Sequence, residues 1–469
     1  MSSNLDRFRR LVNLRGRRGN ADPDVAPASF PAPAPAQSVA PPHTTAPPTA
    51  AEFQSQYEMV TPVGSCLVDL HAYPLDQPRG PHPLGHLLDH APAVFAPLHP
   101  AFCLHSGLDY RRAIFLDTET TGLGNGASVY CFMVGVGSFE TWIGSTPPGS
   151  SATPPPSDTP THFVVRQLFM RSPAEERVLL VALAELLTPY ELMVTFNGRT
   201  FDLPLLRSRY QHNRRFLPTL QEGVALLGEQ RPHLDLLHPA RRLWRRRLQS
   251  CRLINLETQV LGVHRSEDDV PGHEIPLIYQ EYVRTRDDRM IRRVFYHNAE
   301  DIVSMVALAD QLGRAFHTGR SQDTAPATPR AAVHGLDWVG IAQAHERSGN
   351  LSQAEADYRR ALEVVHNPSH RADLFRRLAE LLKRQERWPD AAATWQDWIS
   401  SVPGSDPTPF VELAKYCEWQ LRDLDQAEMW TAWALYTLRN AHPAAQRPAD
   451  QAALAHRLAR LQRKRVARD

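Results

Sequence analysis

The sequence predicts an α/β domain built on a mixed sheet, followed by an all-helical repeat region. Three observations lead to this prediction. Short apolar runs typical of buried strands come first, and runs with helical spacing then alternate with them. After about residue 331 the strand signals disappear and a repeat of helix pairs takes their place. The chain of 469 residues is long enough for about three units, or for two units and their tails.

The first domain is expected over residues 56–318, and its elements can be placed in order. Strands are predicted at 112–117, 129–139, 162–170 and 191–196. Helical spacing predicts helices at 173–187 and 201–210, the first with a proline in its opening turn. Because strands come first and then alternate with helices, we expect a mixed sheet with helices packed on it.

Proline-rich stretches separate the folded parts, since the 40 prolines are unevenly spread. Residues 1–55 are expected to form a basic and Pro/Ala-rich tail with almost nothing to bury. A Pro/Ser-rich stretch at 145–160 indicates a surface insertion between two strands. A third stretch, 319–332, is expected to be a linker between domains.

Residues 333–465 are predicted to form tetratricopeptide-like helical repeats. The first copy carries Gly349, Ala354, Tyr358 and Ala361 at the spacings of such a unit, and two looser copies follow. Helix pairs of this kind bury their small residues only by stacking, and the stack presents a concave surface. Two roles stay open for this region: it recruits a protein partner, or it packs against the first domain.

The composition excludes several classes of protein. The chain has 52 Lys and Arg against 51 Asp and Glu, so nucleic-acid binding would require a local basic patch. The five cysteines form no CxxC pair, which argues against a disulfide scaffold and against a zinc ribbon. No apolar run approaches the roughly 18 residues of a membrane span, and the basic start has no apolar core. We therefore expect a cytoplasmic protein that does not bind a membrane.

Two carboxylates at the end of a buried strand are the most informative signal. Asp117 and Glu119, in FLDTETTG, are two residues apart and therefore leave the same face of the strand. Neighbouring acids repel each other unless a cation neutralises them, so a hard divalent metal ion is a natural partner. On its own, this pattern is equally typical of a turn carboxylate that caps the next segment.

Two further acids lie in similar contexts. Asp202 follows the strand at 191–196 and begins a helix, where a negative charge is favourable even without a function. Asp301 is expected to open an apolar-periodic helix, and His297 lies four residues before it. Residues i and i+4 share a helix face, so the imidazole is expected beside Asp301 as a candidate general base.

These motifs together resemble the DEDD (DnaQ-like) 3′–5′ exonucleases, which have the ribonuclease H-like fold. Asp117, Glu119, Asp202 and Asp301 match the four acids of that family in order. The sequence is still more similar to the YprB-type ribonuclease H-like proteins of bacteria, several of which carry C-terminal helical repeats. The stretches that carry this likeness span most of residues 62–312 and include FLDTETTGL, TFNGRTFDLPLLRSR, PHLDLLHPARRLW, SCRLINLE, DDVPG and HNAEDIVSMVAL.

The resemblance implies that the four acids hold two divalent metal ions, Mg²⁺ or Mn²⁺. It also implies that the protein hydrolyses DNA or RNA from a single-stranded 3′ end. The two standard subtypes place a Tyr four residues before the last acid, or a His five residues before it. Here His297 stands at four and Tyr296 at five. We assign the base role to His297 and treat Tyr296 as a packing residue or supporting donor. A structure-specific endonuclease and a non-catalytic nucleic-acid-binding scaffold remain alternatives.

An arginine-rich run, ARRLWRRRLQSCR, supplies the candidate nucleic-acid-binding residues. Arg241, Arg245 and Arg246 are expected to contact phosphates, and Trp244 to stack on a base. The alternative interpretation is a solvated helix face with Trp244 anchored in the core.

Three other features have simpler interpretations. Asp235 is expected to cap a helix, with an outer-shell acid of the metal site as the alternative. The acids at 267–269 are expected to form a turn near the site. The glycines at 122–126 lack the third glycine of a dinucleotide-binding fingerprint, so no nucleotide cofactor is expected.

Overall fold

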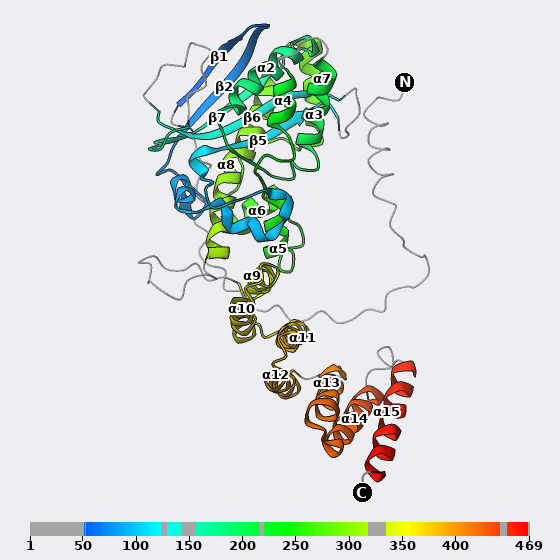
Figure 1. Ribbon diagram of the computed structural model, residues 1–469. Coiled ribbons are helices and arrows are strands. Elements are labelled where there is room, and N and C mark those ends of the chain that lie inside the picture. Colours follow the sequence, from blue (N-terminus) through cyan, green and yellow to red (C-terminus); the bar gives the residue numbers. More distant parts are fainter. Residues whose placement is uncertain are drawn as a thin grey trace, which may run out of the picture. The chain divides into compact units, whose positions relative to one another are not determined.

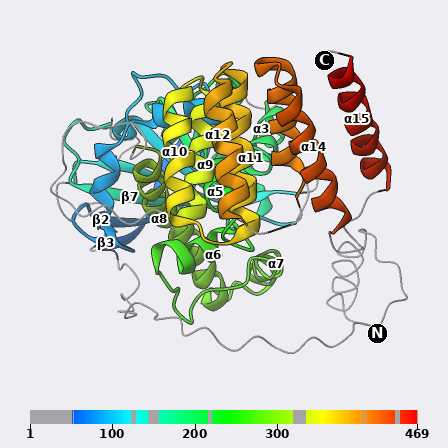
Figure 2. The ribbon, with the colours of Figure 1, turned by 90° about the horizontal axis from the view of Figure 1, so that it is seen from below.

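The structure is a computed structural model, and two views of it are given in Figures 1 and 2. The residues that it describes are 51, 53–122, 129–142, 156–214, 220–317, 334–402, 404, 406–440 and 448–467. The predicted linker at 319–332 lies outside these residues. The same holds for the predicted tail at 1–55 except residues 51 and 53–55, and for the predicted insertion at 145–160 except its last five residues.

A seven-stranded mixed sheet forms the core of the first region, as predicted. Its strands follow in the spatial order β1-β2-β7-β6-β5-β8-β9. The first five strands in this order pair antiparallel, whereas β8 pairs parallel with β5, and β9 parallel with β8. The strands are β1 (Phe53–Thr61), β2 (Gly64–Pro74), β5 (Ala113–Thr120), β6 (Cys131–Glu140), β7 (His162–Phe169), β8 (Leu192–Thr195) and β9 (His233–Asp235). A separate two-stranded ribbon pairs β3 (Pro78–Arg79) with β4 (His82–Pro83).

The hairpin β1–β2 was not predicted from the sequence, and it places the start of the sheet at Phe53, three residues before the expected domain boundary. In β1 most side chains are exposed or half-buried, because it is the outermost strand in the sheet order. Its burial nevertheless alternates along the strand, with Phe53, Tyr57 and Met59 on one face and exposed residues between them, so the sequence carried a strand pattern that was not recognised.

Helices cover both faces of the sheet (Figure 1). Even-numbered residues of β5, such as Ile114 and Leu116, pack in a cluster with α2 and α3, whereas Phe115 packs in another cluster with α8. The helices of this region are α2 (Glu176–Leu187), α3 (Asp202–Asn213), α4 (Leu220–Leu226), α5 (Leu237–Trp244), α6 (Leu253–Leu256), α7 (Ile275–Thr285) and α8 (Arg289–His317). Short 3-10 and π turns join them: η1 (Leu84–Asp89), η2 (Pro92–Leu98), η3 (Pro100–Phe102), η4 (Tyr110–Arg112), η5 (Pro173–Glu175) and η6 (Glu257–Leu261).

Helix α8 begins at Arg289, twelve residues before the helix start that we expected at Asp301. The prediction of a start at Asp301 was wrong because the first turns are rich in arginine and hide their apolar spacing. Ile291, Val294 and Phe295 nevertheless recur at intervals of three and one, and all three are buried. Asp301 therefore lies in the middle of a long helix rather than at its positive end.

Two glycines of β6 allow α8 to approach the sheet closely. A Cβ atom on Gly135 would lie 2.1 Å from Oδ1 of Asn298, and one on Gly137 would lie 2.7 Å from a side-chain carbon of Ile302. Neither distance is compatible with a side chain larger than hydrogen. Glycine at these two positions thus sets how near the residues of α8 come to the end of β5.

The C-terminal region is entirely helical within the residues described, as predicted. Consecutive helices contact one another, and Figure 2 shows the helices of this stack lying side by side. Ala354, Tyr358 and Ala361 are fully buried between helices, in agreement with the spacing seen in the sequence. The helices are α9 (Gly335–Arg347), α10 (Leu351–Val364), α11 (Pro368–Arg384), α12 (Trp388–Ser401), α13 (Thr408–Tyr416), η7 (Cys417–Leu421, a π turn), α14 (Leu424–Arg439) and α15 (Pro448–Val466).

The helical region packs on the sheet-containing region through α5 and α9. A Cβ atom on Gly340 would lie 2.4 Å from the carbonyl oxygen of Arg242, so the two helices meet at backbone distance. Arg247 forms an ion pair with Asp337 of α9, with 3.2 Å between Nε and Oδ1. The helix that carries the arginine-rich run is therefore held between the two regions.

All five cysteines are free; three are buried and two are half-buried. Among the helices described, none combines the length and apolar character that crossing a membrane would require.

Replacement of Gly135 by Ala should lower the stability of the fold by about 1–3 kcal/mol, because the new methyl group overlaps Asn298. The measurement is the midpoint of urea unfolding. Gly272→Ala is the control, since nothing lies within 4 Å of a Cβ atom at that exposed position. Equal midpoints for the two variants would contradict the close packing of α8 on β6.

Candidate active site

The four predicted acids meet at one edge of the sheet. Asp117 and Glu119 lie near the end of β5, and Asp202 begins α3, which follows the neighbouring parallel strand β8. Carboxyl ends of parallel strands share an edge, which explains why these segments converge. Asp301 comes from α8, which packs on β5 and β6. We call Asp117, Glu119, Asp202 and Asp301 the acid edge.

Asn298 holds Asp117 in place. Its Nδ2 donates a hydrogen bond to Oδ2 of Asp117 over 2.8 Å. Its Oδ1 accepts one from Nε2 of Gln167 on β7 over 2.9 Å, and that same nitrogen also donates to the carbonyl of Phe295 over 2.7 Å. Asn298 and Gln167 are both fully buried, so the orientation of the amide is fixed. Sequence analysis missed both residues.

Asp202 is 4% exposed and accepts a hydrogen bond from Oγ1 of Thr118. Side chains alternate along a strand, so Thr118 faces away from Asp117 and Glu119. Asp202 thus reaches the acid edge from the α3 side of β5. Its place in the first turn of a helix agrees with the sequence prediction.

The turn that leads to Asp202 is fixed by Asp235. The backbone N–H groups of Asn197 and Arg199 donate to its two carboxylate oxygens, over 2.8 and 3.1 Å, and that of Leu237 donates over 3.1 Å. Asn197 has a positive φ of 67°, as in a tight turn. Asp235 therefore mainly holds the turn before Asp202. Its bond to Leu237, the first residue of α5, is the part of this set that corresponds to the helix cap expected from the sequence.

Arg265 is the principal cation at the acid edge, and the sequence did not reveal it. It is almost fully buried and donates to Asp301 and to both carboxylate oxygens of Glu257, the latter over 2.7 Å each. Burial alone would lower the pKa of Arg265, but Asp301 and Glu257 raise it. The guanidinium is thus permanently charged and balances part of the negative charge.

His297 lies beside Asp301, as its spacing predicted. Its Nδ1 is 2.7 Å from Oδ1 of Asp269, and its Nε2 is 3.8 Å from Oδ2 of Asp301. Burial alone would lower the pKa of His297, but Asp301, the hydrogen bond to Asp269 and Glu119 raise it to about 9. The acidic segment at 267–269, expected only as a turn, therefore also supplies the carboxylate that orients the imidazole.

Tyr296 takes a structural position. Its hydroxyl oxygen accepts a hydrogen bond from the backbone N–H of Ser266 over 3.0 Å. This contact ties α8 to the segment that carries Arg265 and Asp269, and so helps to position both side chains.

Three of the four acids are held in an unfavourable electrostatic environment. Burial, together with the neighbouring acids, raises the pKa of Asp117 well above its ordinary value. Burial also raises the pKa of Glu119 to about 8, with further increases from Asp301 and Asp202. The pKa of Asp202 is raised to about 7 by burial, although the hydrogen bond from Thr118 opposes this. A cation among these groups would favour their ionised forms.

The acid edge fits a hard divalent cation in the chemistry of its donors, which are carboxylate oxygens. Within the described residues, however, no three acid, histidine or cysteine side chains are arranged so that they could hold an ion. Asp202 is engaged by Thr118, and Asp301 by Arg265. Joint coordination by all four acids would require these two side chains to leave their present partners.

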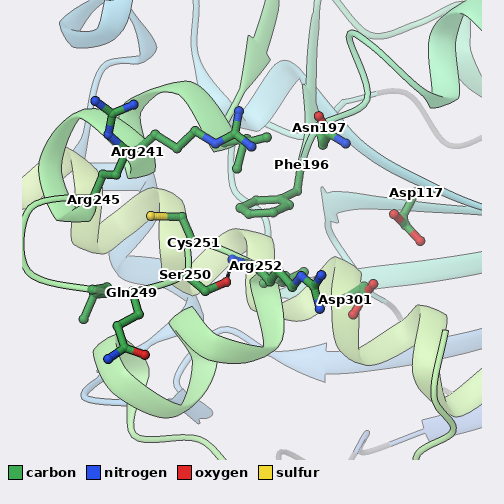
Figure 3. A pocket seen from close by; sticks show the side chains of 13 residues that line it. Asp117, Phe196, Asn197, Arg241, Arg245, Gln249, Ser250, Cys251, Arg252 and Asp301 are labelled. Carbon is green, nitrogen blue, oxygen red and sulfur yellow. Dashed lines mark hydrogen bonds between the residues drawn. The ribbon is translucent and has the colours of Figure 1, made fainter. Parts of the chain in front are cut away.

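A pocket of about 530 Å³ adjoins the acid edge (Figure 3). Asp117 and Asp301 line it, together with Arg241 and Arg245 from α5 and its last turn. Arg252, Phe196 and Cys251 line it as well. In the view of Figure 3, the ring of Phe196 lies between the two arginines of α5 and the two acids.

The two other candidate nucleic-acid-binding residues do not line this pocket. Trp244 is only 3% exposed and packs in the core beside Leu243, so the predicted stacking on a base is not supported. Arg246 forms an ion pair with Asp373 of α11 over 3.4 Å. The arginine-rich run is therefore divided between the pocket and the contact with the helical region.

Comparison with known proteins identifies the sheet-containing region. Residues 114–313 match the family RNase_H_2, described as RNase_H superfamily. Over these residues the chain is similar to the RNase H superfamily. The matched stretch runs from β5 to α8 and includes all four residues of the acid edge. A curated relative is the uncharacterized protein YprB of Bacillus subtilis (strain 168), which is 28% identical over 326 residues, or 68% of each chain.

An RNase H superfamily domain indicates a nuclease-type function and nucleic-acid binding. Nucleases of this fold generally use divalent metal ions. Hard oxygen ligands at the end of a central strand agree with that chemistry.

Mg²⁺ or Mn²⁺ should raise the melting temperature of the protein by a few degrees, because a ligand that binds only the folded state stabilises it by about 2.7 kcal/mol at 100-fold excess over Kd. Glu119→Gln should remove most of this shift while melting no lower than wild type in EDTA, because burial raises the pKa of Glu119 to about 8 and glutamine resembles the neutral carboxyl that is then present near pH 7. The measurement is differential scanning calorimetry. Asp89→Asn, at an exposed carboxylate outside the acid edge, should retain the shift. An unaltered shift in the Glu119 variant would remove that residue from the metal site.

Proposed function

We propose that the protein is a metal-dependent nuclease that hydrolyses phosphodiester bonds of DNA or RNA, and that it acts as a 3′–5′ exonuclease. One observation carries the proposal: the convergence of Asp117, Glu119, Asp202 and Asp301 within the stretch that is similar to the RNase H superfamily. Such a cluster of buried like charges is costly to the fold, and a catalytic role accounts for that cost.

In this proposal the acid edge would hold two divalent ions, Mg²⁺ or Mn²⁺. When bound, such ions supply a water nucleophile of lowered pKa and neutralise charge on the transferring phosphoryl group. The protein's own contribution is positional. Asn298 fixes one carboxylate oxygen of Asp117, and Asp235 fixes the turn that presents Asp202.

His297 is the proposed proton acceptor. Asp269 engages Nδ1, which leaves Nε2, on the Asp301 side, as the atom that would take a proton from water. The raised pKa of His297 keeps the imidazole protonated at neutral pH in the present arrangement. Neutralisation of Asp301 and Glu119 would remove two of the three interactions that raise this pKa, and so return the imidazole toward its basic form.

A second candidate function is favoured by the ion pair between Arg265 and Asp301. A protein that binds nucleic acid without cutting it could keep this ion pair permanently. Its helical region, which we propose to consist of tetratricopeptide-like units, would then recruit a protein partner. The two functions differ in whether bound nucleic acid is shortened.

Asp117→Asn and Asp202→Asn should each reduce cleavage by about 1,000-fold or more, because loss of a metal-binding carboxylate removes several kcal/mol of transition-state stabilisation. The assay uses 5′-labelled single-stranded DNA and RNA with Mg²⁺, Mn²⁺ or EDTA. The wild-type protein should give a metal-dependent ladder that shortens from the 3′ end.

Asp89→Asn serves as the folded control in the same gel and should cut at the wild-type rate. Wild-type cleavage by both Asp117→Asn and Asp202→Asn would exclude the proposed site. Retarded but uncut nucleic acid with the wild-type protein would favour the non-catalytic alternative.

A further inference from the structure

The arginines that line the pocket differ from their neighbours in having no partner. Within the part of the chain that the structure describes, the side chains of Arg241, Arg245 and Arg252 make no ion pair or hydrogen bond. All three are exposed. Arg241 and Arg245 are four residues apart, so they share one face of the helix and repel each other.

The remaining arginines of the same run are all engaged. Arg242 donates to the carbonyl of Leu98 over 2.6 Å. Arg246 and Arg247 pair with Asp373 and Asp337 of the helical region. The arginines of this run thus fall into two groups: those with partners make structural contacts, and those without partners line the pocket.

Unpaired guanidiniums that converge on one cavity give it a positive potential that favours an anion. The planar donor fork of arginine matches a phosphate group. The pocket also offers an aromatic surface, because the half-buried ring of Phe196 lies between Arg241, Arg245 and the acid edge in Figure 3. Phosphate-binding arginines beside an aromatic ring are the combination that binds a nucleotide of a single strand.

We propose that this pocket holds the nucleotide next to the scissile phosphate, with its own phosphate bound by Arg241, Arg245 and Arg252 and its unpaired base against Phe196. The inference rests on the proposed function, since it names the part of the substrate that lies beside the acid edge. A pocket of this kind selects single-stranded nucleic acid, because a base within a duplex is not free to stack on a side chain. It also requires that the substrate carry a second phosphate that is not cut.

The test measures binding separately from cleavage. Fluorescence anisotropy of a 5′-labelled single-stranded oligonucleotide of about 12 nucleotides is recorded in EDTA over a range of salt concentrations. Arg241→Gln, Arg245→Gln and Arg252→Gln should each weaken binding several-fold and reduce the salt slope of log K by about 0.7–1, which is the loss of one phosphate contact.

Two matched variants sharpen the test. Arg246→Gln removes a guanidinium from the same helix, but outside the pocket, and should leave both affinity and slope unchanged. Phe196→Leu should weaken binding without altering the slope, because stacking displaces no counterions. A duplex of the same sequence should bind more weakly and should not respond to Phe196→Leu. Circular dichroism melting confirms that each variant is folded.

The pocket assignment is overturned if Arg246→Gln weakens binding as much as Arg241→Gln, or if none of the three pocket variants alters the slope. Asp117→Asn is assayed in parallel for binding and for metal-dependent cleavage. Normal binding by the arginine variants together with loss of cleavage in Asp117→Asn would overturn the pocket and leave the nuclease standing. Weakened binding by the arginine variants together with full cleavage by Asp117→Asn would support the pocket and overturn the proposed nuclease site.

Discussion

The close packing of α8 on β6 is the contact on which the geometry of the acid edge depends. Gly135 and Gly137 present no side chain to the helix, so Asn298 and Ile302 reach the sheet surface. From that position Asn298 bridges Gln167 of β7 and Asp117 of β5. The same helix carries His297 and Asp301, and a small outward shift of α8 would separate both from the end of β5. Glycine at position 135 is thus required by the site, whereas a side chain at position 137 would also meet Phe163 of the neighbouring strand β7, 2.4 Å away.

Charge is balanced around the acid edge by a chain of alternating ions. The fully buried Arg79 lies 2.6 Å from Glu300 and 3.8 Å from Glu257, and Glu257 in turn pairs with Arg265. Arg265 ends the chain at Asp301. Removal of one member would leave a buried charge without compensation, which is strongly destabilising. Within this series of ion pairs, Arg265 would compete with a metal ion for the carboxylate of Asp301. Metal binding at Asp301 is therefore coupled to the position of Arg265.

The sequence predicted the mixed sheet, the helical C-terminal region, the two acids of β5 and the place of Asp202 at a helix start, because each rests on a local pattern. Asp117 and Glu119 follow a buried apolar run, and the buried alanines of the helical region recur at regular spacing. The rest of the site depends on contacts between distant residues: Gln167 and Asn298 are 131 positions apart, and Arg265 and Asp301 are 36 apart. A single buried amide or arginine leaves no periodic signal. The sequence left two roles open for Trp244, stacking on a base or anchoring the helix in the core, because spacing does not show which face of a helix meets the core; its burial favours the second.

The central claim is that the acid edge binds the divalent ions of a nuclease. The most direct measurement is the anomalous scattering of crystals grown with Mn²⁺, with data collected at the manganese edge. Manganese peaks are expected among Asp117, Glu119, Asp202 and Asp301, with Arg265 displaced from Asp301. Crystals in which Mn²⁺ binds only elsewhere, with the ion pair between Arg265 and Asp301 intact, would contradict this claim.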